Sequence, residues 1–196
     1  MNAALPQSLL DNIKKDFGAI MNITNKLGDS YLLQTKLVKK TYSNEHAWTC
    51  YRIAEAFYKN DDATRAIIYF KKAVELAPLG LEFKNKLGSA YASTNQMPLA
   101  EKQFKEILNE YPKHVSALTN LGFITLQKGD VTSCQTLYFK ALALDPDYEP
   151  LLLNIAGLYA YKKDFKQAKF YLERILKRNP NNSQAQQALS QIKPYL

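Results

Sequence analysis

Four prolines recur along the chain at a constant interval of 34 residues: Pro78, Pro112, Pro146 and Pro180. Each follows a stretch in which apolar residues are spaced three and four apart, which is typical of one face of an α-helix. Proline is common just after a helix because it cannot continue one. A constant interval of this length is typical of stacked helical units that share a continuous core. The spacing therefore predicts a repeat protein.

Other residues recur at fixed distances from these prolines. A small side chain stands twelve residues before each proline, and a bulky apolar one stands eight residues before it. Small side chains let two helices approach closely, while bulky ones fill the space between them. The two sets are Ala66, Ala100, Cys134 and Ala168, and Phe70, Phe104, Tyr138 and Leu172. With Ala73, Ile107, Ala141 and Ile175 they complete an apolar stripe that predicts one helix in each repeat.

A second pattern occupies the first half of each repeat. An aliphatic residue is followed by a small one, and three positions later an aromatic residue stands in three of the four copies. The pairs are Ile53-Ala54, Leu87-Gly88, Leu121-Gly122 and Ile155-Ala156, and the following residues are Phe57, Tyr91, Thr125 and Tyr159. The small residue allows close packing within a helical hairpin, and the aromatic ring fills the gap between hairpins.

These residues resemble the tetratricopeptide repeat family over residues 47–182. The resemblance implies an all-α, right-handed α-solenoid of four helical hairpins, at 47–80, 81–114, 115–148 and 149–182. The chain departs from the family pattern at Cys50 and Lys84, where a large residue is usual, and at Thr125 and Cys134. None of these changes is expected to abolish a repeat.

The two ends of the chain differ from the repeats. Residues 1–46 are interpreted as an N-terminal helical cap or a degenerate hairpin, with a second helix at Ser30 to Lys40. Residues 183–196 predict a C-terminal capping helix that Pro194 ends, since a solenoid needs polar terminal caps for solubility. Side chains able to cap the second helices stand in the turns, at Asp61 or Asp62, Asn95, Asp130 and Asp164.

No pattern in the sequence indicates an enzyme, a metal or a cofactor. Cys50 and Cys134 belong to no CxxC or Cys/His cluster, and His46 and His114 lie two repeats apart, too far to share a metal. No apolar run approaches the roughly 20 residues needed to cross a bilayer. With 46% hydrophobic and 22% charged residues, the chain is expected to be a globular protein with no membrane partner. It is expected to be cytoplasmic if Met1 is the native start.

The net charge is +8, and 22 of the 26 cationic residues are lysine. A basic run, which we call the basic segment, comprises Lys162, Lys163, Lys166, Lys169, Arg174, Lys177 and Arg178. Nucleic-acid binding through this segment is a weaker alternative function. A solvated outer helix is the favoured interpretation, because the segment carries no recognised nucleic-acid motif.

The resemblance implies a concave groove lined by the first helix of each repeat. The residues at groove-facing positions that we select as partner-binding are Trp48, Tyr51, Arg52, Glu55, Tyr58, Asn85, Lys86, Ser89, Asn120, Phe123, Gln127, Asn154 and Tyr161. The remaining groove-facing positions hold Lys59, Glu82, Ala92, Ser93, Ser116, Thr119, Leu126, Pro150, Leu153, Gly157 and Ala160. Arg52, Lys86, Asn120 and Asn154 lie one repeat apart and predict a ladder of donors for an extended peptide backbone. The alternative is that asparagine at this position only caps neighbouring backbone groups.

The leading prediction is a non-catalytic scaffold that binds a protein or an extended peptide in this groove. The alternative is an interaction module of a larger enzyme or multi-haem protein. The carboxylate clamp of chaperone-binding family members needs Lys, Asn, Asn, Lys and Arg. The corresponding residues here are Tyr51, Glu55, Lys86, Ser116 and Asn120, which excludes a chaperone-tail receptor. The sequence predicts neither the identity of the partner nor the oligomeric state.

Overall fold

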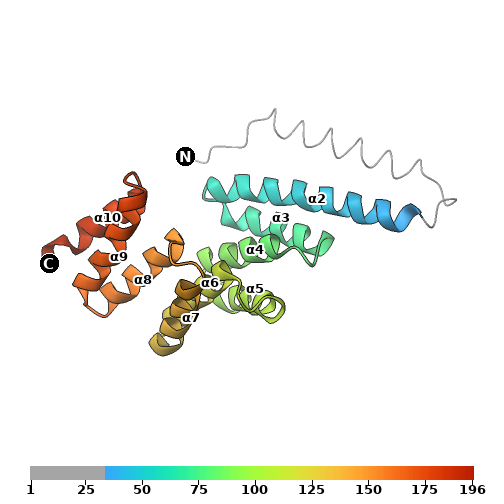
Figure 1. The fold of residues 1–196 in the computed structure, drawn as a ribbon. Helices are drawn as coiled ribbons and strands as arrows, with labels where there is room; N and C mark the ends of the chain where they lie inside the picture. The colour runs from blue at the N-terminus through green and yellow to red at the C-terminus, as the bar shows by residue number, and fades with distance from the viewer. Residues whose placement is uncertain (1–33) are drawn as a thin grey trace. The chain divides into compact units, whose positions relative to one another are not determined.

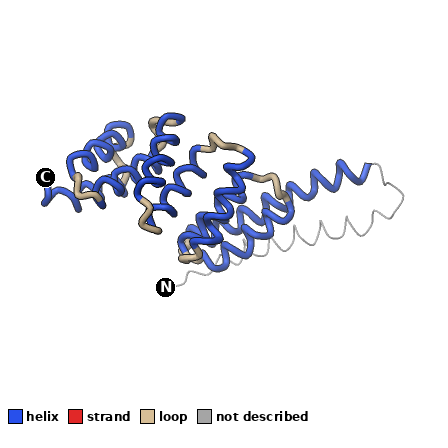
Figure 2. Tube along the Cα trace, turned by 90° about the horizontal axis from the view of Figure 1, so that it is seen from below, coloured by secondary structure: helices blue, strands red, loops and turns tan. Residues whose placement is uncertain are grey.

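The structure is a computed structural model that describes the backbone of residues 34–196 and the side chains from residue 44 onward. Most of the predicted N-terminal cap therefore lies outside the described residues. The described part is helical and contains no strand (Figures 1 and 2). Its helices are α2 (Gln34–Lys59), α3 (Ala63–Leu76), α4 (Leu81–Ser93), α5 (Met97–Glu110), α6 (Val115–Gln127), α7 (Val131–Leu144), α8 (Glu149–Tyr161), α9 (Phe165–Arg178) and α10 (Ser183–Ile192), followed by the 3-10 helix η1 (Lys193–Tyr195).

Successive helices pair into four hairpins, α2 with α3, α4 with α5, α6 with α7 and α8 with α9. Short loops join the helices, which forces chain neighbours to run antiparallel (Figure 2). The predicted all-α helical-repeat fold is confirmed. The chain divides into two compact units, unit 1 ending at Leu79 and unit 2 running from Gly80 to Leu196.

Unit 1 contains α2 and α3. Ala54 and Ala66 are fully buried where the two helices meet, together with the Phe70 ring. A separate helix at Ser30 to Lys40 was expected, but the structure instead has α2 running unbroken from Gln34 to Lys59. The reason is local, because no glycine or proline stands in this stretch to end a helix.

Unit 2 contains helices α4 to α10, and its core confirms the predicted pairing of small and bulky residues. A Cβ added at Gly88 would lie 2.6 Å from the Phe104 ring, and one at Gly122 would lie 2.4 Å from the Tyr138 ring. The glycines are therefore required for the close approach of α4 to α5 and of α6 to α7. Lys84 is buried in this unit, and its ammonium group reaches Glu110 at 3.2 Å.

Two positions after the last residue of each repeat's first helix stands a residue with positive φ. These residues are Asp61, Asn95, Gly129 and Lys163, one repeat apart. The next residue donates its N–H to a carbonyl five positions back, as Asp164 does to Tyr159 at 2.9 Å. The chain then starts the second helix, and Asp62, Asp130 and Asp164 cap it as predicted.

The prediction that Asn95 caps α5 is wrong. Asn95 adopts the left-handed conformation that ends α4, so its side chain is one residue too early to cap the next helix. Gln96 occupies the N-cap position of α5 and makes no side-chain capping bond. The start of α6 is capped by His114, whose Nδ1 accepts a hydrogen bond from the Ala117 N–H at 3.2 Å.

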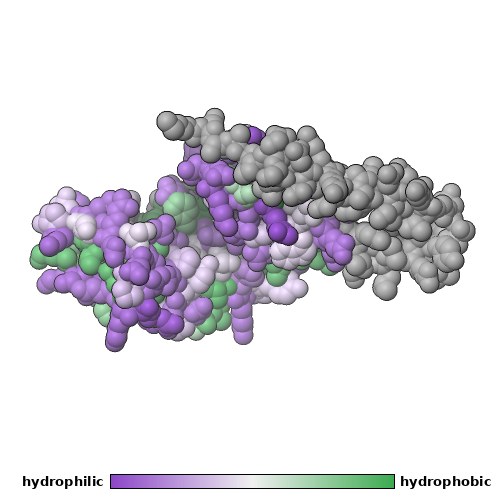
Figure 3. Space-filling view, turned by 90° about the horizontal axis from the view of Figure 1, so that it is seen from above, coloured by the Kyte–Doolittle hydropathy of each residue, from purple (hydrophilic) through white to green (hydrophobic). Residues whose placement is uncertain are grey.

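The C-terminal helix occupies residues 183–192, as predicted, and its Asn182 cap accepts a hydrogen bond from the Ala185 N–H. It buries Ala185 and Ile192 against the core that α8 and α9 provide. In the space-filling view, hydrophilic side chains dominate the coloured surface, with smaller hydrophobic patches among them (Figure 3). None of the described helices is long and apolar enough to span a membrane.

Candidate binding pocket

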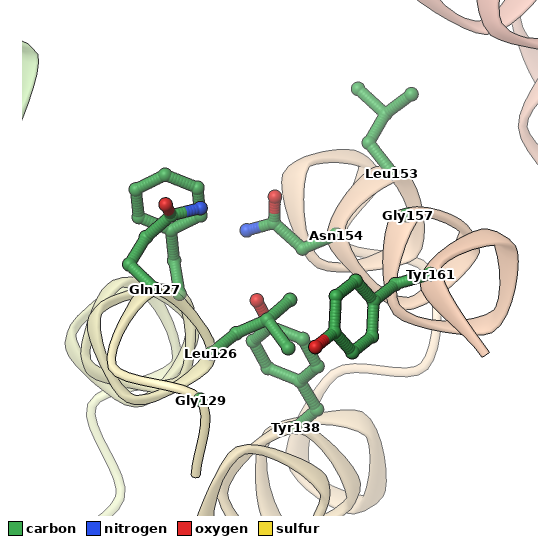
Figure 4. A pocket seen from close by; sticks show the side chains of 9 residues that line it. Leu126, Gln127, Gly129, Tyr138, Leu153, Asn154, Gly157 and Tyr161 are labelled. Atoms are coloured by element: carbon green, nitrogen blue, oxygen red, sulfur yellow. The ribbon is translucent and has the colours of Figure 1, made fainter. Parts of the chain in front are cut away.

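A pocket of about 510 Å³ lies in unit 2, between the first helices α6 and α8, with α7 contributing to it from below (Figure 4). Its lining residues come from three helices and one turn. They are Phe123, Leu126, Gln127, Gly129, Tyr138, Leu153, Asn154, Gly157 and Tyr161. Seven of these nine occupy positions that the sequence pattern places toward the groove. This pocket is the candidate functional site.

Helical spacing explains why these side chains meet. On α6, Leu126 and Gln127 lie three and four residues after Phe123. On α8, Gly157 lies four residues after Leu153 and three after Asn154, and Tyr161 lies four residues after Gly157. Residues with this spacing share one face of a helix. Because α6 and α8 pack against one another, the two faces border the same space.

The α8 side of the pocket is open. Gly157 is exposed, and a Cβ added there would meet no atom within 4 Å. Tyr161, one turn further along, is 66% exposed, although it is a large aromatic residue. Single exposed apolar residues are common, but an exposed ring beside a hollow supplies contact surface for a ligand.

The polar groups of the pocket are all uncharged. The amides of Gln127 and Asn154 face the space between α6 and α8, and the Tyr138 ring points from α7 toward the same space (Figure 4). No acidic or basic residue belongs to the lining. The pocket is therefore suited to neutral groups, because a charge that leaves water needs a partner.

Tyr138 is 1% exposed, and its hydroxyl group is buried without a hydrogen-bond partner. Burial, together with the neighbouring Cys134 thiol, raises the pKa of the Tyr138 hydroxyl, so the group stays protonated at neutral pH. It can therefore donate a hydrogen bond as well as accept one.

Sequence reasoning missed Tyr138 as a site residue, because its position belongs to the core stripe. The equivalent residues in the other repeats are Phe70, Phe104 and Leu172. Those side chains fill the same place with carbon alone, so packing does not require the hydroxyl. The signal that could have identified Tyr138 is its hydroxyl group, because the equivalent residues of the other repeats are all apolar.

The predicted donor ladder is changed by a bond between neighbouring repeats. The Asn120 amide donates to the Asn85 side-chain oxygen at 3.0 Å, joining α6 to α4. The Ser89 hydroxyl donates to the Asn85 carbonyl of its own helix at 3.1 Å, and Lys86 acts electrostatically on Tyr148. This bond to a side chain of the preceding repeat is not the backbone cap that was the alternative for Asn120. Asn154 is the ladder residue that lies in the pocket.

The five predicted residues before residue 60 belong to α2 in unit 1. Tyr51 is 5% exposed, and its ring centre lies 5.7 Å from that of Phe70, so its assignment to an open groove surface is wrong. Tyr51 faces the core because it lies four residues after the buried Ala47 and three residues before the buried Ala54. Trp48 is 51% exposed and meets the edge of Tyr51. Arg52 is exposed, whereas Glu55 and Tyr58 are half-buried.

The basic segment is partly neutralised by acidic neighbours. Arg174 and Arg178 both contact Asp147, Arg174 at 2.9 Å, and Lys169 lies 3.6 Å from Glu173. The Arg174 guanidinium, aided by Arg178, holds the pKa of Asp147 below its usual value. The two arginine contacts with Asp147 join α9 to the turn before α8, so these two cations stabilise the fold.

The two cysteines are buried, and burial raises the pKa of both thiols. A raised pKa lowers the thiolate fraction, and the thiolate is the nucleophile and metal ligand. Cys50 and Cys134 therefore behave as small hydrophobic residues. Within the described region, no group of histidine, cysteine and acidic residues could hold a metal ion.

Two family models, both described as tetratricopeptide repeat, match residues 51–115 and 125–192, together more than half of the chain. The chain belongs to the tetratricopeptide repeat family. The chain is also similar to a solved structure, the thermophilic TPR protein TTC0263 of Thermus thermophilus. The TM-score is 0.70 at 17% identity, over 76% of this chain and 81% of that one.

A second solved structure is the first TPR of Spaghetti (RPAP3) bound to the HSP90 peptide SRMEEVD. It matches with a TM-score of 0.52 and 18% identity, over 58% of this chain and 90% of that one. Among curated proteins, RNA polymerase-associated protein CTR9 of Caenorhabditis elegans is 29% identical over 117 residues, which is 58% of this chain and 10% of that protein. The chain spans 36% and 25% of two further curated relatives.

Proposed function

We propose that unit 2 is a non-catalytic binding module that holds an extended segment of a protein partner against helices α4, α6 and α8. The observation that carries this proposal is the open, uncharged pocket between α6 and α8. Its volume of about 510 Å³ falls within the range of sites that bind small ligands or single side chains. A scaffold with such a pocket can anchor one residue of a peptide and leave its neighbours along the groove.

The amides beside the pocket support a peptide as the ligand. Asn154 and Gln127 each offer a carbonyl and an N–H group, which match the two polar groups of a peptide unit. Asn120 is held in place by Asn85, so its second amide hydrogen and its carbonyl are presented in a defined orientation. A preorganised side chain loses less entropy on binding than a mobile one.

The first TPR of Spaghetti is bound to a peptide in its solved structure, which supports the idea that this kind of fold holds a peptide. The acidic sequence of that peptide, however, is a poor match for the pocket described here. No cation lines the pocket, and the positions of the carboxylate clamp hold other residues. We therefore expect a partner segment that is neutral at its anchoring residue.

Nucleic-acid binding is less well supported, because phosphate contacts require cations. The pocket lining has none, and Arg174, Arg178 and Lys169 of the basic segment are already paired with carboxylates. A module of a larger protein agrees with the short share of CTR9 that the chain spans. Such a module of a larger protein could bind a peptide in the same way.

The test is to select peptides from a random phage-displayed library on the full chain and to measure their affinity by calorimetry. Gly157→Leu should weaken the selected peptides at least about tenfold, because the new side chain occupies the open space above α8. Gly157→Ala fills far less of that space and should bind nearly as wild type. Lys166→Ala, on exposed α9 surface, should also bind normally. Equal peptide affinities of Gly157→Leu and the wild type would contradict the proposal.

A further inference from the structure

The buried Tyr138 hydroxyl is the feature of the pocket that packing does not explain. It lies on α7, within a side chain that is 1% exposed, and no protein oxygen or nitrogen forms a hydrogen bond with it, although the Cys134 thiol lies beside it. A buried polar group without a partner destabilises a fold, so native chains rarely keep one without a reason. Phenylalanine would avoid this cost, and the chain carries phenylalanine at the equivalent positions 70 and 104.

The hydroxyl is directed toward a place where a ligand could supply the missing partner. Tyr138 lines the pocket, and Figure 4 shows its ring extending from α7 toward the space between Gln127 and Asn154. The pocket thus has aromatic and aliphatic walls, from Phe123, Leu126, Leu153 and Tyr161, with one unsatisfied hydroxyl at its base.

We propose that the pocket binds a tyrosine side chain of the partner segment, whose phenol hydroxyl forms a hydrogen bond with the hydroxyl of Tyr138. This inference rests on the proposed function, since it names the residue that a bound peptide would place in the pocket. A phenol ring matches the apolar walls, and its tip matches the single polar group at the base. Its hydroxyl can donate or accept, which suits a Tyr138 hydroxyl whose polar neighbour within the fold is the weakly hydrogen-bonding Cys134 thiol.

The lining argues against other anchoring residues. A carboxylate or ammonium tip would lose its hydration with no opposite charge to replace it, because none of the lining residues is charged. Phenylalanine would fill the walls but leave the Tyr138 hydroxyl unpaired. For the same reason a phosphotyrosine should be rejected, since phosphate recognition requires cations such as arginine.

Small probes of the tyrosine and phenylalanine side chains test this inference on the full chain without a known partner. Nitrogen-15-labelled protein is titrated with p-cresol, toluene and p-tolyl phosphate while the backbone amide signals are followed. p-Cresol should shift the signals of the pocket residues, among them Gln127, Gly157 and Tyr161. It should bind about two- to tenfold more tightly than toluene, as expected for one hydrogen bond. p-Tolyl phosphate should not bind.

Two variants make the test specific. Tyr138→Phe should fold, because it restores the residue found at positions 70 and 104, and it should bind p-cresol and toluene equally. Gly157→Leu should lose both, whereas Lys166→Ala, on the exposed surface of α9, should keep the preference for p-cresol. Equal affinities of the two probes in the wild type, or an unchanged preference in Tyr138→Phe, would overturn the inference. So would probe-induced shifts that lie away from the pocket.

The outcome separates this inference from the proposed function. If the probes fail as just described, while a selected peptide still loses affinity in Gly157→Leu, the tyrosine assignment is wrong and the binding groove stands. If p-cresol binds as expected but no peptide is retained by the chain, the groove proposal fails while the pocket chemistry stands.

Discussion

Lys163 adopts a backbone conformation that lysine rarely takes. Its φ of 60° lies in the left-handed region, where a Cβ atom crowds the backbone. Gly129 occupies the same position one repeat earlier without that cost. The strain at Lys163 is tolerated because the turn it makes ends α8 and lets Asp164 cap α9.

We predict that Lys163→Gly stabilises the protein by about 1 kcal/mol, because glycine reaches this conformation without strain. The measurement is urea unfolding followed by circular dichroism. Lys162→Gly is the matched control. Its φ of −76° is ordinary, so glycine there should give no gain. Equal effects of the two changes would show that the left-handed turn is not the cause.

Gly122 is needed for a contact, whereas Gly157 is not. A Cβ at Gly122 would meet the buried Tyr138 ring at 2.4 Å, and one at Gly157 would meet open space. Alanine favours a helix over glycine by about 1 kcal/mol at either position. The two glycines should therefore respond to the same substitution with opposite signs.

We predict that Gly122→Ala destabilises the protein by about 1–3 kcal/mol, since the cost of overpacking exceeds the gain in helix propensity. Gly157→Ala should stabilise it by about 1 kcal/mol. Adding Tyr138→Leu to Gly122→Ala should recover part of the loss, because Ala156 and Leu172 form that combination in the fourth repeat. Chemical denaturation of the three variants measures this. Stabilisation by Gly122→Ala would mean that α6 and α7 are further apart than described.

At the scale of single helices, α6 begins with a titratable cap. The neutral His114 ring accepts the Ala117 N–H at Nδ1, and a protonated ring could not. Burial lowers the pKa of His114, although its own hydrogen bond and the nearby Glu82 oppose the shift. His114 therefore binds a proton less readily in the folded state than in the unfolded state, where its pKa is the ordinary value of about 6.5.

We predict that the unfolding free energy falls as pH drops below about 6.5, until the pH passes the lower pKa of folded His114. His114→Asn should reduce this dependence, because asparagine caps a helix without titrating. Urea unfolding at several values between pH 7.5 and 5.5 measures it. The capping carboxylates Asp62 and Asp130 have lowered pKa values, so their contributions are lost only at more acidic pH. An identical pH dependence in wild type and variant would exclude the cap as its origin.

Helices and their packing were predictable here because each pattern is repeated four times. The spacing of the prolines and of pairs such as Leu121-Gly122 sets which faces are buried, and hairpins made of neighbouring segments leave few alternatives. Asn95 was misassigned because an αL residue and an N-cap are adjacent and favour the same residue types. Tyr51 was misassigned because the buried face of α2 depends on what packs against it, which a repeat pattern does not state.

The pocket was predictable only in part. Groove positions on α6 and α8 follow from the family pattern, and seven of the lining residues have such positions. Tyr138 contributes from the core side of α7, and the Asn120 side chain bonds to Asn85 of the preceding repeat. Both depend on how helices distant in sequence are placed, so neither could be derived from the spacing of residues within one repeat.

At the scale of the whole molecule, unit 2 combines a core that is shared between neighbouring repeats with side chains that differ from repeat to repeat. The shared register buries equivalent residues in each hairpin, while single substitutions in it, such as Tyr138 where the first two repeats have phenylalanine and the fourth has leucine, distinguish one repeat from the next. Specificity in such a fold is expected to come from these departures, since the common residues are buried.

The central claim is that a peptide binds to the first-helix face of unit 2 at the pocket between α6 and α8. The most direct measurement is a nuclear magnetic resonance map of the full chain with a peptide selected from the library. The account predicts the largest amide shifts at Gln127, Asn154, Gly157 and Tyr161, and small shifts along the outer helix α9. Shifts concentrated on α9, between Lys166 and Arg178, with the pocket signals unchanged, would contradict it.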